Sequence, residues 1–335
     1  MKKLLTALDL EAISMGSTIF ATGGAFSFDE QKRLLEGFKP FDSKVTLWSI
    51  DEFPPDATFA TVYGVGAAGA SPDALEALIP KALELVQKRV KKNITGIFPG
   101  ETGIEAFLFR AVSKLGIPVL DADGTGGRAV PEVRIDNFIL QGVSTLPLFA
   151  LRDDGAILQI DDSNTSGSAL EAKIRNFSLD GGSGSVLVLD HLCSPKLAAA
   201  NLTLGTISRS LTLGKALQSA TPLSEVLNAI DANFMGKFTI IKSELARKNG
   251  FLAGNVYLEN QSSALTVEVK NENLRVRNND KTIIQAPQLI FLIDELKRTA
   301  VHNAEIIEKQ QVLLYTLKPE SRWATKKAEE FFWAA

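Results

Sequence analysis

The sequence predicts two domains of different class, an α/β domain followed by a β-rich domain. Helical and strand-like patterns alternate up to residue 120, whereas short β-rich segments follow one another from residue 237 to residue 293. Between these patterns, residues 161–167 form a polar cluster of turn-forming residues. A chain of 335 residues is long enough for about two domains. We therefore expect the α/β domain in residues 1–165 and the β-rich domain in residues 166–335.

The first domain is predicted to be built from alternating helices and strands. Helical patterns cover residues 9–20, 29–38, 72–91 and 103–115, and strand patterns cover residues 44–50, 58–65, 94–98 and 117–120. Pro72 suits the first turn of the third helix, where no backbone N–H is needed. The last strand, helix and strand have the spacing of a βαβ unit, so we expect these two strands to be parallel.

The second domain is predicted to contain a few helices and then many short strands. Helical patterns cover residues 168–177 and 203–231, where Pro222 opens a helical segment, and strand patterns cover residues 237–243, 251–258, 264–270, 274–278, 288–293 and 311–317. A helical tail with Phe331, Phe332 and Trp333 closes the chain. An exposed tail of this kind would bind a partner, but packing on the β-rich domain is the stronger expectation.

The composition excludes several classes of protein. With 36 basic and 39 acidic residues, the chain lacks the basic surface of a general nucleic-acid binder. Cys193 is the only cysteine, which excludes an intrachain disulfide and a multi-cysteine zinc site. His191 lies two residues before it, but the sequence reveals no orienting acid, so a His/Cys catalytic site is disfavoured.

The hydropathy pattern argues against membrane insertion and export. No apolar run approaches the ~18 residues that a membrane span needs, and Asp9 and Glu11 interrupt the apolar start of the chain. We therefore expect a cytoplasmic protein whose partner is a small-molecule substrate, with no nucleic acid and no membrane. The sequence is also compatible with a homo-oligomer.

Two acidic loops follow the strands of the predicted βαβ unit, PGETG (99–103) and DADGTGGRAVPE (121–132). In open α/β sheets, ligands bind beyond the carboxyl ends of the strands, and adjacent strands lie about 4.8 Å apart. We therefore expect Glu101 and Asp121 to face one region, where repulsion between carboxylates separates an acid from a base. Glu101, Asp121 and Asp123 are also able to hold a divalent metal through oxygen ligands, and solvated loop acids are the plain alternative.

The second loop adds glycines and a cation to these acids. Gly124 begins a flexible segment that ends at Arg128, whose guanidinium is able to neutralise an anion. Neither this segment nor the turn Gly23-Gly24 matches a dinucleotide fingerprint or a phosphate-binding loop. The polar segment Asn271-Glu272-Asn273 lies between two strand patterns, where it either enters the site or forms an exposed turn.

Several ordered motifs resemble one known family. The segment PGETGIEAFLFRAVSKLGIPVLDADGTGGRAVPEV (99–133) is similar to the signature of the S-methyl-thiohydantoin desulfurase-like family, which is associated with hydantoinase and oxoprolinase systems. LTLGTISRSLTLGKAL (202–217) resembles a helix of that family. FMGKF, NGFLAGNV, VKNENL and APQLIFLID, all between residues 234 and 294, resemble its C-terminal β-domain in order and spacing.

The resemblance implies an N-terminal α/β layered domain intertwined with a C-terminal swivelling-type β/β/α domain. It also implies a hydrolase-like enzyme that acts on a small cyclic imide or thioimide of the thiohydantoin or hydantoin type. The catalytic residues that it implies are Glu101, Asp121, Asp123, Arg128 and Glu132. The candidate residues for substrate binding are Gly23, Gly24, Gly124 and Asn271.

In the expected mechanism, Asp121 or Asp123 acts as general base on water, and Glu101 acts as acid or as a metal ligand. Arg128 stabilises the anionic intermediate. Two departures from the family pattern support an alternative, a non-catalytic metabolite-binding or interaction protein on the same scaffold. Ala106 stands where the family usually has asparagine, and an additional glycine at 126–127 moves Arg128 along its loop.

Overall fold

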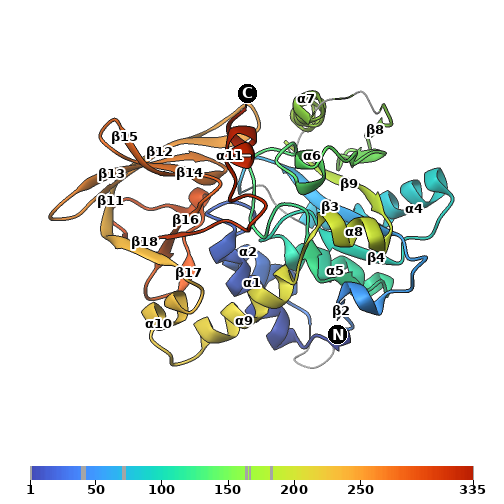
Figure 1. The fold of residues 1–335 in the computed structure, drawn as a ribbon, viewed down its shortest axis with the longest axis horizontal. Coiled ribbons are helices and arrows are strands. Elements are labelled where there is room, and N and C mark those ends of the chain that lie inside the picture. The colour runs from blue at the N-terminus through green and yellow to red at the C-terminus, as the bar shows by residue number, and fades with distance from the viewer. Residues whose placement is uncertain are drawn as a thin grey trace.

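The computed structural model describes residues 2–38, 43–69, 73–162, 165, 167–181 and 184–334. Two large sheets lie on opposite sides of the molecule, and helices α1 (Ala7–Phe20) and α9 (Thr206–Gln218) lie between them (Figure 1). One sheet is mixed, and the other is antiparallel throughout. The predicted combination of an α/β part with a β-rich part is confirmed.

The mixed sheet has eight strands. Its order is β1 (Lys2–Leu4), β2 (Thr46–Trp48), β5 (Val119–Leu120), β4 (Gly96–Pro99), β3 (Phe59–Gly66), β9 (Ser185–Cys193), β7 (Leu148–Leu151) and β8 (Ile157–Ile160). β4 and β5 are adjacent and parallel, with Ile97 opposite Val119, as the βαβ pattern predicts. β9 pairs antiparallel with both β3 and β7. The second half of the sequence therefore supplies a central strand of this sheet.

Further helices belong to this part of the molecule. They are α2 (Phe28–Leu35), η1 (Ile50–Glu52), α3 (Asp73–Glu76), α4 (Ile79–Val90), α5 (Glu105–Leu115), α6 (Asn137–Leu140), α7 (Gly167–Leu179) and α8 (Pro195–Asn201). The prediction of one continuous helix over residues 72–91 is wrong, because α3 and α4 are separate. Pro80 lies in the first turn of α4, the position that proline tolerates best. Pro72 lies outside the described residues.

The antiparallel sheet also has eight strands. Its order is β15 (Lys281–Gln285), β14 (Glu272–Asn278), β13 (Ala264–Lys270), β12 (Phe251–Glu259), β11 (Asn233–Lys248), β18 (Gln311–Leu317), β16 (Leu289–Asp294) and β17 (Thr299–Ala300). η2 (Asn303–Glu305) precedes β18. The predicted helical region 203–231 divides into α9 and α10 (Leu223–Asn228). β10 (Thr203–Leu204), just before α9, pairs with β6 (Ala122–Asp123).

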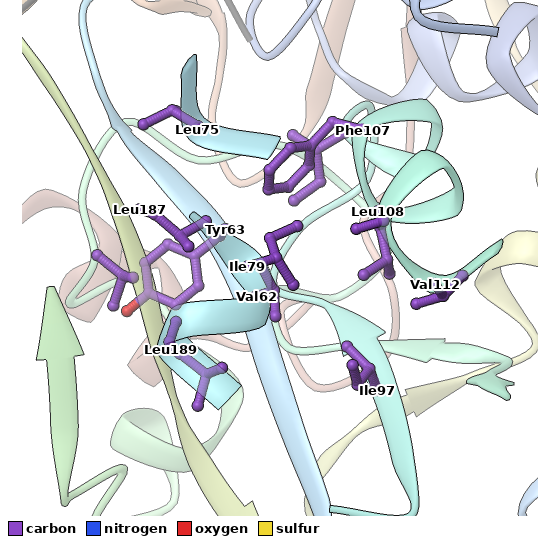
Figure 2. Close-up of a cluster of buried hydrophobic side chains, with 14 of the residues drawn as sticks. Val62, Tyr63, Leu75, Ile79, Ile97, Phe107, Leu108, Val112, Leu187 and Leu189 are labelled. Carbon is purple, nitrogen blue, oxygen red and sulfur yellow. The ribbon is translucent and has the colours of Figure 1, made fainter. Parts of the chain in front are cut away.

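The main core lies between the mixed sheet and its helices. Figure 2 shows Val62 and Ile97, from the central strands, near Phe107 and Leu108 of α5, and Leu187 of β9 belongs to the same cluster. All five side chains are fully buried. α5 ends at Gly116, whose left-handed backbone (φ +69°) is the usual glycine helix stop. No helix in the described part of the chain is both long and apolar enough to cross a membrane.

Helices α1 and α9 join the two parts of the molecule by an unusually close contact. A Cβ atom at Gly16 would lie 2.0 Å from the backbone oxygen of Ser210, and one at Gly214 would lie 1.7 Å from that of Ala12. Only glycine permits this approach. Further along the same helices, apolar side chains pack against Phe291 of the antiparallel sheet. The relative placement of the sheets is therefore fixed by two glycines and an apolar cluster.

The aromatic tail forms α11 (Lys326–Trp333), which lies between the antiparallel sheet and α6 (Figure 1). Phe332 is buried in a cluster with Trp323, and the indole N–H of Trp333 donates to the backbone oxygen of Ala286 at 2.7 Å. Arg134 donates to the backbone oxygen of Phe331 at 2.8 Å. The tail therefore packs on its own chain, and the aromatic patch that would support a partner surface is largely covered.

Candidate active site

A pocket lies where the carboxyl ends of β3 and β4 approach the antiparallel sheet. The cavity has a volume of about 100 Å³, measured as the space open to the centre of a water molecule. On this measure a single water needs about 10–15 Å³, so the pocket has room for more than one water. The main polar groups of its lining are Tyr63, Glu101, Glu132, Asp136, Arg175 and His191 from the α/β side, and Asn271 and Glu272 from the antiparallel sheet. A concave site between two parts of a molecule is a common place for a small ligand.

Glu101 follows β4 after one intervening glycine, so the strand carries it to the pocket. A Cβ atom at Gly100 would lie 2.7 Å from the Tyr63 ring, which explains the glycine before Glu101. The Glu101 Oε2 atom accepts a hydrogen bond from the N–H of Val130 at 2.9 Å. Burial, together with the charge of Asp123, outweighs this hydrogen bond and raises the pKa of Glu101 to about 8.

Glu272 faces the same pocket from the start of β14. Its side chain is 2% exposed, and its Oε2 atom has no hydrogen-bond partner among the described residues. Burial raises the pKa of Glu272 well above its ordinary value, and the negative charge of Glu101 adds to this effect. A carboxyl group left buried and unpartnered is costly for folding, which makes it a candidate for a functional role.

Glu101 and Glu272 together form a carboxyl pair that resists losing both protons. Like charges in one buried site separate the two ionisations, so one carboxyl stays protonated while the other ionises. Glu101 is the partner that ionises more readily, because it is more exposed and accepts the N–H of Val130. The pair can therefore supply a base and an acid at one place.

Arg175 of α7 places a positive charge beside this pair and lowers the pKa of both carboxyls. Its Nε atom donates to Glu171 at 2.8 Å, and its Nη atoms donate to the backbone oxygens of Gly66, Gly250 and Pro131. The guanidinium thereby connects β3, the β11–β12 turn and the loop between β6 and α6. It provides a fixed positive charge at the pocket wall.

A second polar group lines the same pocket. The Tyr63 hydroxyl donates to Asp190 at 3.0 Å, and the His191 ring lies between Asp190 (2.5 Å from Nδ1) and Asp136 (3.0 Å from Nε2). Burial lowers the pKa of His191, but Asp136 and Asp190 outweigh burial and raise it to about 10. An imidazole that faces a carboxylate on both nitrogens donates from both only when it is protonated. The pocket wall therefore contains a buried imidazolium held by two carboxylates.

The structure places Asp121 away from the pocket, at the start of α9. Asp121 Oδ1 accepts from the backbone N–H groups of Ile207 and Ser208 at 3.0 Å each, and Oδ2 accepts from the Ser208 hydroxyl at 2.5 Å. These are the N–H groups that a helix leaves unpaired at its first turn. Its catalytic role stays a prediction, but the geometry favours a helix cap, and the expected meeting of Glu101 with Asp121 is replaced by that of Glu101 with Glu272.

Asp123 holds the glycine-rich loop together. Its Oδ1 atom accepts from the N–H groups of Thr125 (3.0 Å) and Gly127 (2.9 Å), and its Oδ2 atom accepts from the Thr102 hydroxyl at 2.9 Å. Burial raises the pKa of Asp123 to about 6 against these hydrogen bonds. The carboxylate has both oxygens occupied and does not line the pocket, so the geometry does not support it as the base.

Arg128 is fully buried behind the pocket and does not line it. It donates to the backbone oxygens of Ala129 and Pro287 and lies over the Phe332 ring, 5.1 Å from its centre. Burial lowers the pKa of Arg128 to about 10, partly offset by the charges of Glu272 and Glu101. Its expected direct contact with an anionic intermediate therefore lacks support.

Glu132 lines the pocket as an ionised group with partners. It pairs with Arg134 at 2.5 Å and with Lys270 of the antiparallel sheet. These two cations outweigh burial and lower the pKa of Glu132. This carboxylate connects the two parts of the molecule at the pocket rim, and a proton-transfer role for it stays a prediction.

Of the candidate substrate-binding residues, Asn271 lines the pocket with φ +59°, and its Oδ1 atom accepts hydrogen bonds from the N–H groups of Ala68 and Leu252. Gly23, Gly24 and Gly124 do not line it. The first packs on Asn303, the second on the Glu272 carboxyl and the third on the Asp136 carboxyl. Two of the three glycines therefore make room for pocket side chains rather than for a ligand.

Glu101, Asp121 and Asp123, which the sequence allows but does not require to hold a divalent metal, do not line one pocket. Asp121 caps α9, Asp123 binds its own loop, and only Glu101 reaches the pocket. Within the described ranges, no group of three or more histidine, cysteine, aspartate or glutamate side chains is able to hold a metal ion. The lone Cys193 is buried, and burial raises its pKa to about 12.

Sequence reasoning places Glu272 in a polar segment that either enters the site or forms an exposed turn, but it gives Glu272 no catalytic role, and it misses the acids around His191. Glu272 belongs to the motif VKNENL, next to Asn271. A charged residue between two apolar strand patterns is the feature of the sequence that could have indicated it as a site residue. Asp190 adjoins His191 in the sequence, whereas Asp136 lies 55 positions away. No spacing rule connects such distant residues, so only the fold could bring Asp136 to the histidine.

The comparisons with known proteins agree with this fold. Residues 8–162 match the family model described as "S-Me-THD-like, N-terminal domain", and residues 165–332 match "S-Me-THD-like, C-terminal domain". No curated relative matches the sequence. A crystal structure of a protein from Chromobacterium violaceum is similar over 99% of this chain and 95% of that chain, with a TM-score of 0.79 and 21% identity, which supports the fold alone. The chain therefore belongs to the S-Me-THD-like family, the S-methyl-thiohydantoin desulfurase-like family that its motifs indicate.

Proposed function

We propose that this protein is a cytoplasmic hydrolase that acts on a small cyclic imide or thioimide of the thiohydantoin or hydantoin type. The observation that carries the proposal is the carboxyl pair of Glu101 and Glu272, which come from different parts of the molecule and line one pocket. The family supports the thiohydantoin class of substrate. The raised pKa values of both carboxyls support proton transfer.

In the first step, Glu101 acts as the general base. Its carboxylate takes a proton from water, and the water oxygen bonds to the ring carbon that carries sulfur. Glu272 gives its proton to the ring nitrogen of the same C=N bond, so that a neutral tetrahedral intermediate forms. Arg175 stabilises the negative charge that moves between the two carboxyls.

In the second step, the carbon–sulfur bond breaks. Glu101 gives the proton it took from water to the departing sulfur, and the hydroxyl of the intermediate gives its proton to Glu272. The products of an S-methylthiohydantoin are then a hydantoin and methanethiol, and both carboxyls return to their starting states. The overall change consumes one water.

The first test replaces each carboxyl in turn. Because one positioned acid or base contributes about 10²–10⁴-fold, Glu101→Gln and Glu272→Gln should each lower kcat by at least about 100-fold. The rate of the normal enzyme should rise with pH through about 8, the pKa of Glu101. The measurement is chromatography of the hydantoin formed from an S-methylthiohydantoin.

Glu105→Gln is the matched control. Glu105 is a buried carboxyl whose pKa burial raises to about 7, but it does not line the pocket. The charge of Glu105 raises the pKa of Glu101, so this variant should keep normal turnover above about pH 8, where Glu101 is ionised in both proteins. Normal turnover in folded Glu101→Gln or Glu272→Gln would remove that residue from the mechanism.

The alternative function, a metabolite-binding protein without catalysis, is favoured by one observation. Arg128, the cation expected at the anionic intermediate, does not line the pocket. Thermal-shift measurements with cyclic imides distinguish the two functions. Stabilisation without product formation at any pH between 6 and about 9 (around the pKa of Glu101) would favour binding alone, and product formation would favour the enzyme.

A further inference from the structure

The pocket has a second polar side that the reaction proposed above does not use. It is formed by Tyr63, Asp136 and His191, and Asp190 lies directly behind it. The hydrogen bonds run in one chain from Tyr63 to Asp190, from Asp190 to His191 and from His191 to Asp136. All four side chains are at least nine-tenths buried.

The local backbone is built to hold His191 in this place. The pairing of β9 with β3 is interrupted between Asp190 and Cys193, and His191 adopts a left-handed conformation with φ +51°. Such a conformation costs free energy in a residue with a Cβ and persists where surroundings impose it. The edge-on rings of Phe138 (4.8 Å between centres) and Phe98 (6.2 Å) fix the imidazole.

The hydrogen-bond donors on this side are already used. Both His191 ring nitrogens donate to carboxylates, its backbone N–H donates to Thr145, and the Tyr63 hydroxyl donates to Asp190. The N–H groups of Gly100 and Gly124 donate to backbone oxygens. Asp136 accepts from the N–H groups of Phe138 and Ile139 and from His191, so both of its oxygens are occupied. The acceptor capacity that remains on this side is that of the Tyr63 phenolic oxygen.

The charge of the cluster points in the same direction. One imidazolium and two carboxylates leave a net negative charge behind the pocket wall. A ligand carbonyl facing this wall would meet acceptors and negative charge, whereas a ligand N–H would complete the hydrogen bonds.

We propose that the side of the pocket formed by Tyr63, His191 and Asp136 binds a ring N–H of the ligand and thereby restricts the substrate to rings that keep an unsubstituted N–H at that edge. Tyr63 supplies the acceptor, and Asp190, His191 and Asp136 are positioning residues that fix its hydroxyl rotation. The identity of the ring rests on the proposed function. Because a site built to pair with a ligand donor rejects an analogue that lacks it, N-methylation at this edge should weaken binding at least about tenfold.

The experiment measures the dissociation constants of hydantoin, 1-methylhydantoin and 3-methylhydantoin by calorimetry. The normal protein should bind hydantoin and one methyl isomer with similar affinity and the other isomer at least about tenfold more weakly. Tyr63→Phe should bind all three with affinities within about threefold of one another. Tyr315→Phe, an equally buried tyrosine of the other sheet, should behave like the normal protein.

Each outcome decides a separate statement. Equal binding of all three rings by the normal protein would overturn the N–H requirement while leaving the hydrolase proposal standing, and this comparison needs no variant to fold. Discrimination that survives in Tyr63→Phe would remove Tyr63 from recognition. Failure of all three rings to bind would overturn the proposed substrate class and this inference with it.

Discussion

The acids of the two loops after β4 and β5 differ in how many hydrogen bonds their oxygens accept. Asp121 accepts three at the start of α9, and Asp123 accepts three within its own loop and from Thr102. Glu101 accepts one, from Val130. A carboxylate with both oxygens occupied has little capacity to take a proton from water. Remaining acceptor capacity, rather than acidity, therefore distinguishes the candidate reactive residue.

Gly24 provides a test of the Glu272 position at the same scale. A Cβ atom at this position would lie 2.0 Å from Glu272 Oε1, so Gly24→Ala must displace the carboxyl. The end of a glutamate side chain moves easily, so we expect a free energy of unfolding within about 1 kcal/mol of normal. Turnover should fall at least about tenfold, since about 1 Å of misplacement is costly in catalysis.

Urea unfolding and the chromatographic assay together measure both effects. Normal turnover in Gly24→Ala would show that the reaction tolerates a displaced Glu272, which contradicts its role as the acid.

At the scale of elements, α11 and the turn before it close the space between the antiparallel sheet and α6. Trp323 is 1% exposed, its indole N–H donates to Asn137 at 2.8 Å, and its ring lies where a Cβ at Gly126 would clash. The glycine at position 126 thus makes room for this indole, which explains part of the glycine-rich loop without a ligand.

Trp323→Ala should therefore be strongly destabilising. Replacing a fully buried tryptophan by alanine costs about 3–5 kcal/mol, and the Oδ1 atom of Asn137 would lose the indole donor. Trp323→Phe, which keeps most of the apolar contact, should cost less. The measurement is the free energy of unfolding in urea; a loss below about 1 kcal/mol in Trp323→Ala would mean that this packing contributes little.

The elements that the sequence predicts best are those with strong local signals. Thr6 caps the start of α1, where its hydroxyl accepts from the N–H of Asp9 in a capping box, and the βαβ unit around α5 has clear periodicity. The sequence analysis does not predict β7 and β8, two strands of four residues each. β15 was missed because its residues are mostly exposed, so no apolar alternation marks it.

At the scale of the whole molecule, the candidate site requires both halves of the chain. Glu101 follows a strand of the mixed sheet, Glu272 begins a strand of the antiparallel sheet, and Arg175 comes from a helix between them in sequence. The contact between α1 and α9 fixes the position of one sheet relative to the other. Any movement of one sheet against the other would therefore change the distance within the carboxyl pair.

Burial of these acids predicts how stability depends on pH. Burial raises the pKa of Glu101 from 4.5 to about 8, that of Glu105 from 4.5 to about 7 and that of Asp123 from 3.8 to about 6. Between these limits the folded protein keeps protons that the unfolded chain has released, so stability falls as the pH rises. We expect the free energy of unfolding to decrease from about pH 5 to about pH 8.

His191 acts with the same sign at higher pH. Asp136 and Asp190 raise its pKa from 6.5 to about 10 against burial, so its stabilising effect is complete below about pH 6.5 and is lost as the pH approaches 10. Urea unfolding at a series of pH values measures both effects. In Glu101→Gln, the free energy of unfolding should decrease less between pH 5 and pH 8 than in the normal protein. A free energy of unfolding that increases from pH 5 to pH 8 would show that these acids are ionised in the folded protein.

The sequence by itself determined the family, the α/β plus β-rich class, the parallel βαβ unit and the place of Glu101 beyond a strand, because periodicity, helix caps and ordered motifs are local signals. Only the tertiary structure decided which acids meet. Asp121 and Asp123 carry the same side chain, yet the docking of α9 and the folding of the glycine loop occupy them both. Glu272, 171 positions after Glu101 in the chain, reaches the pocket because two glycines let α1 and α9 approach closely. Contacts between residues so distant in sequence depend on packing, which no local pattern encodes.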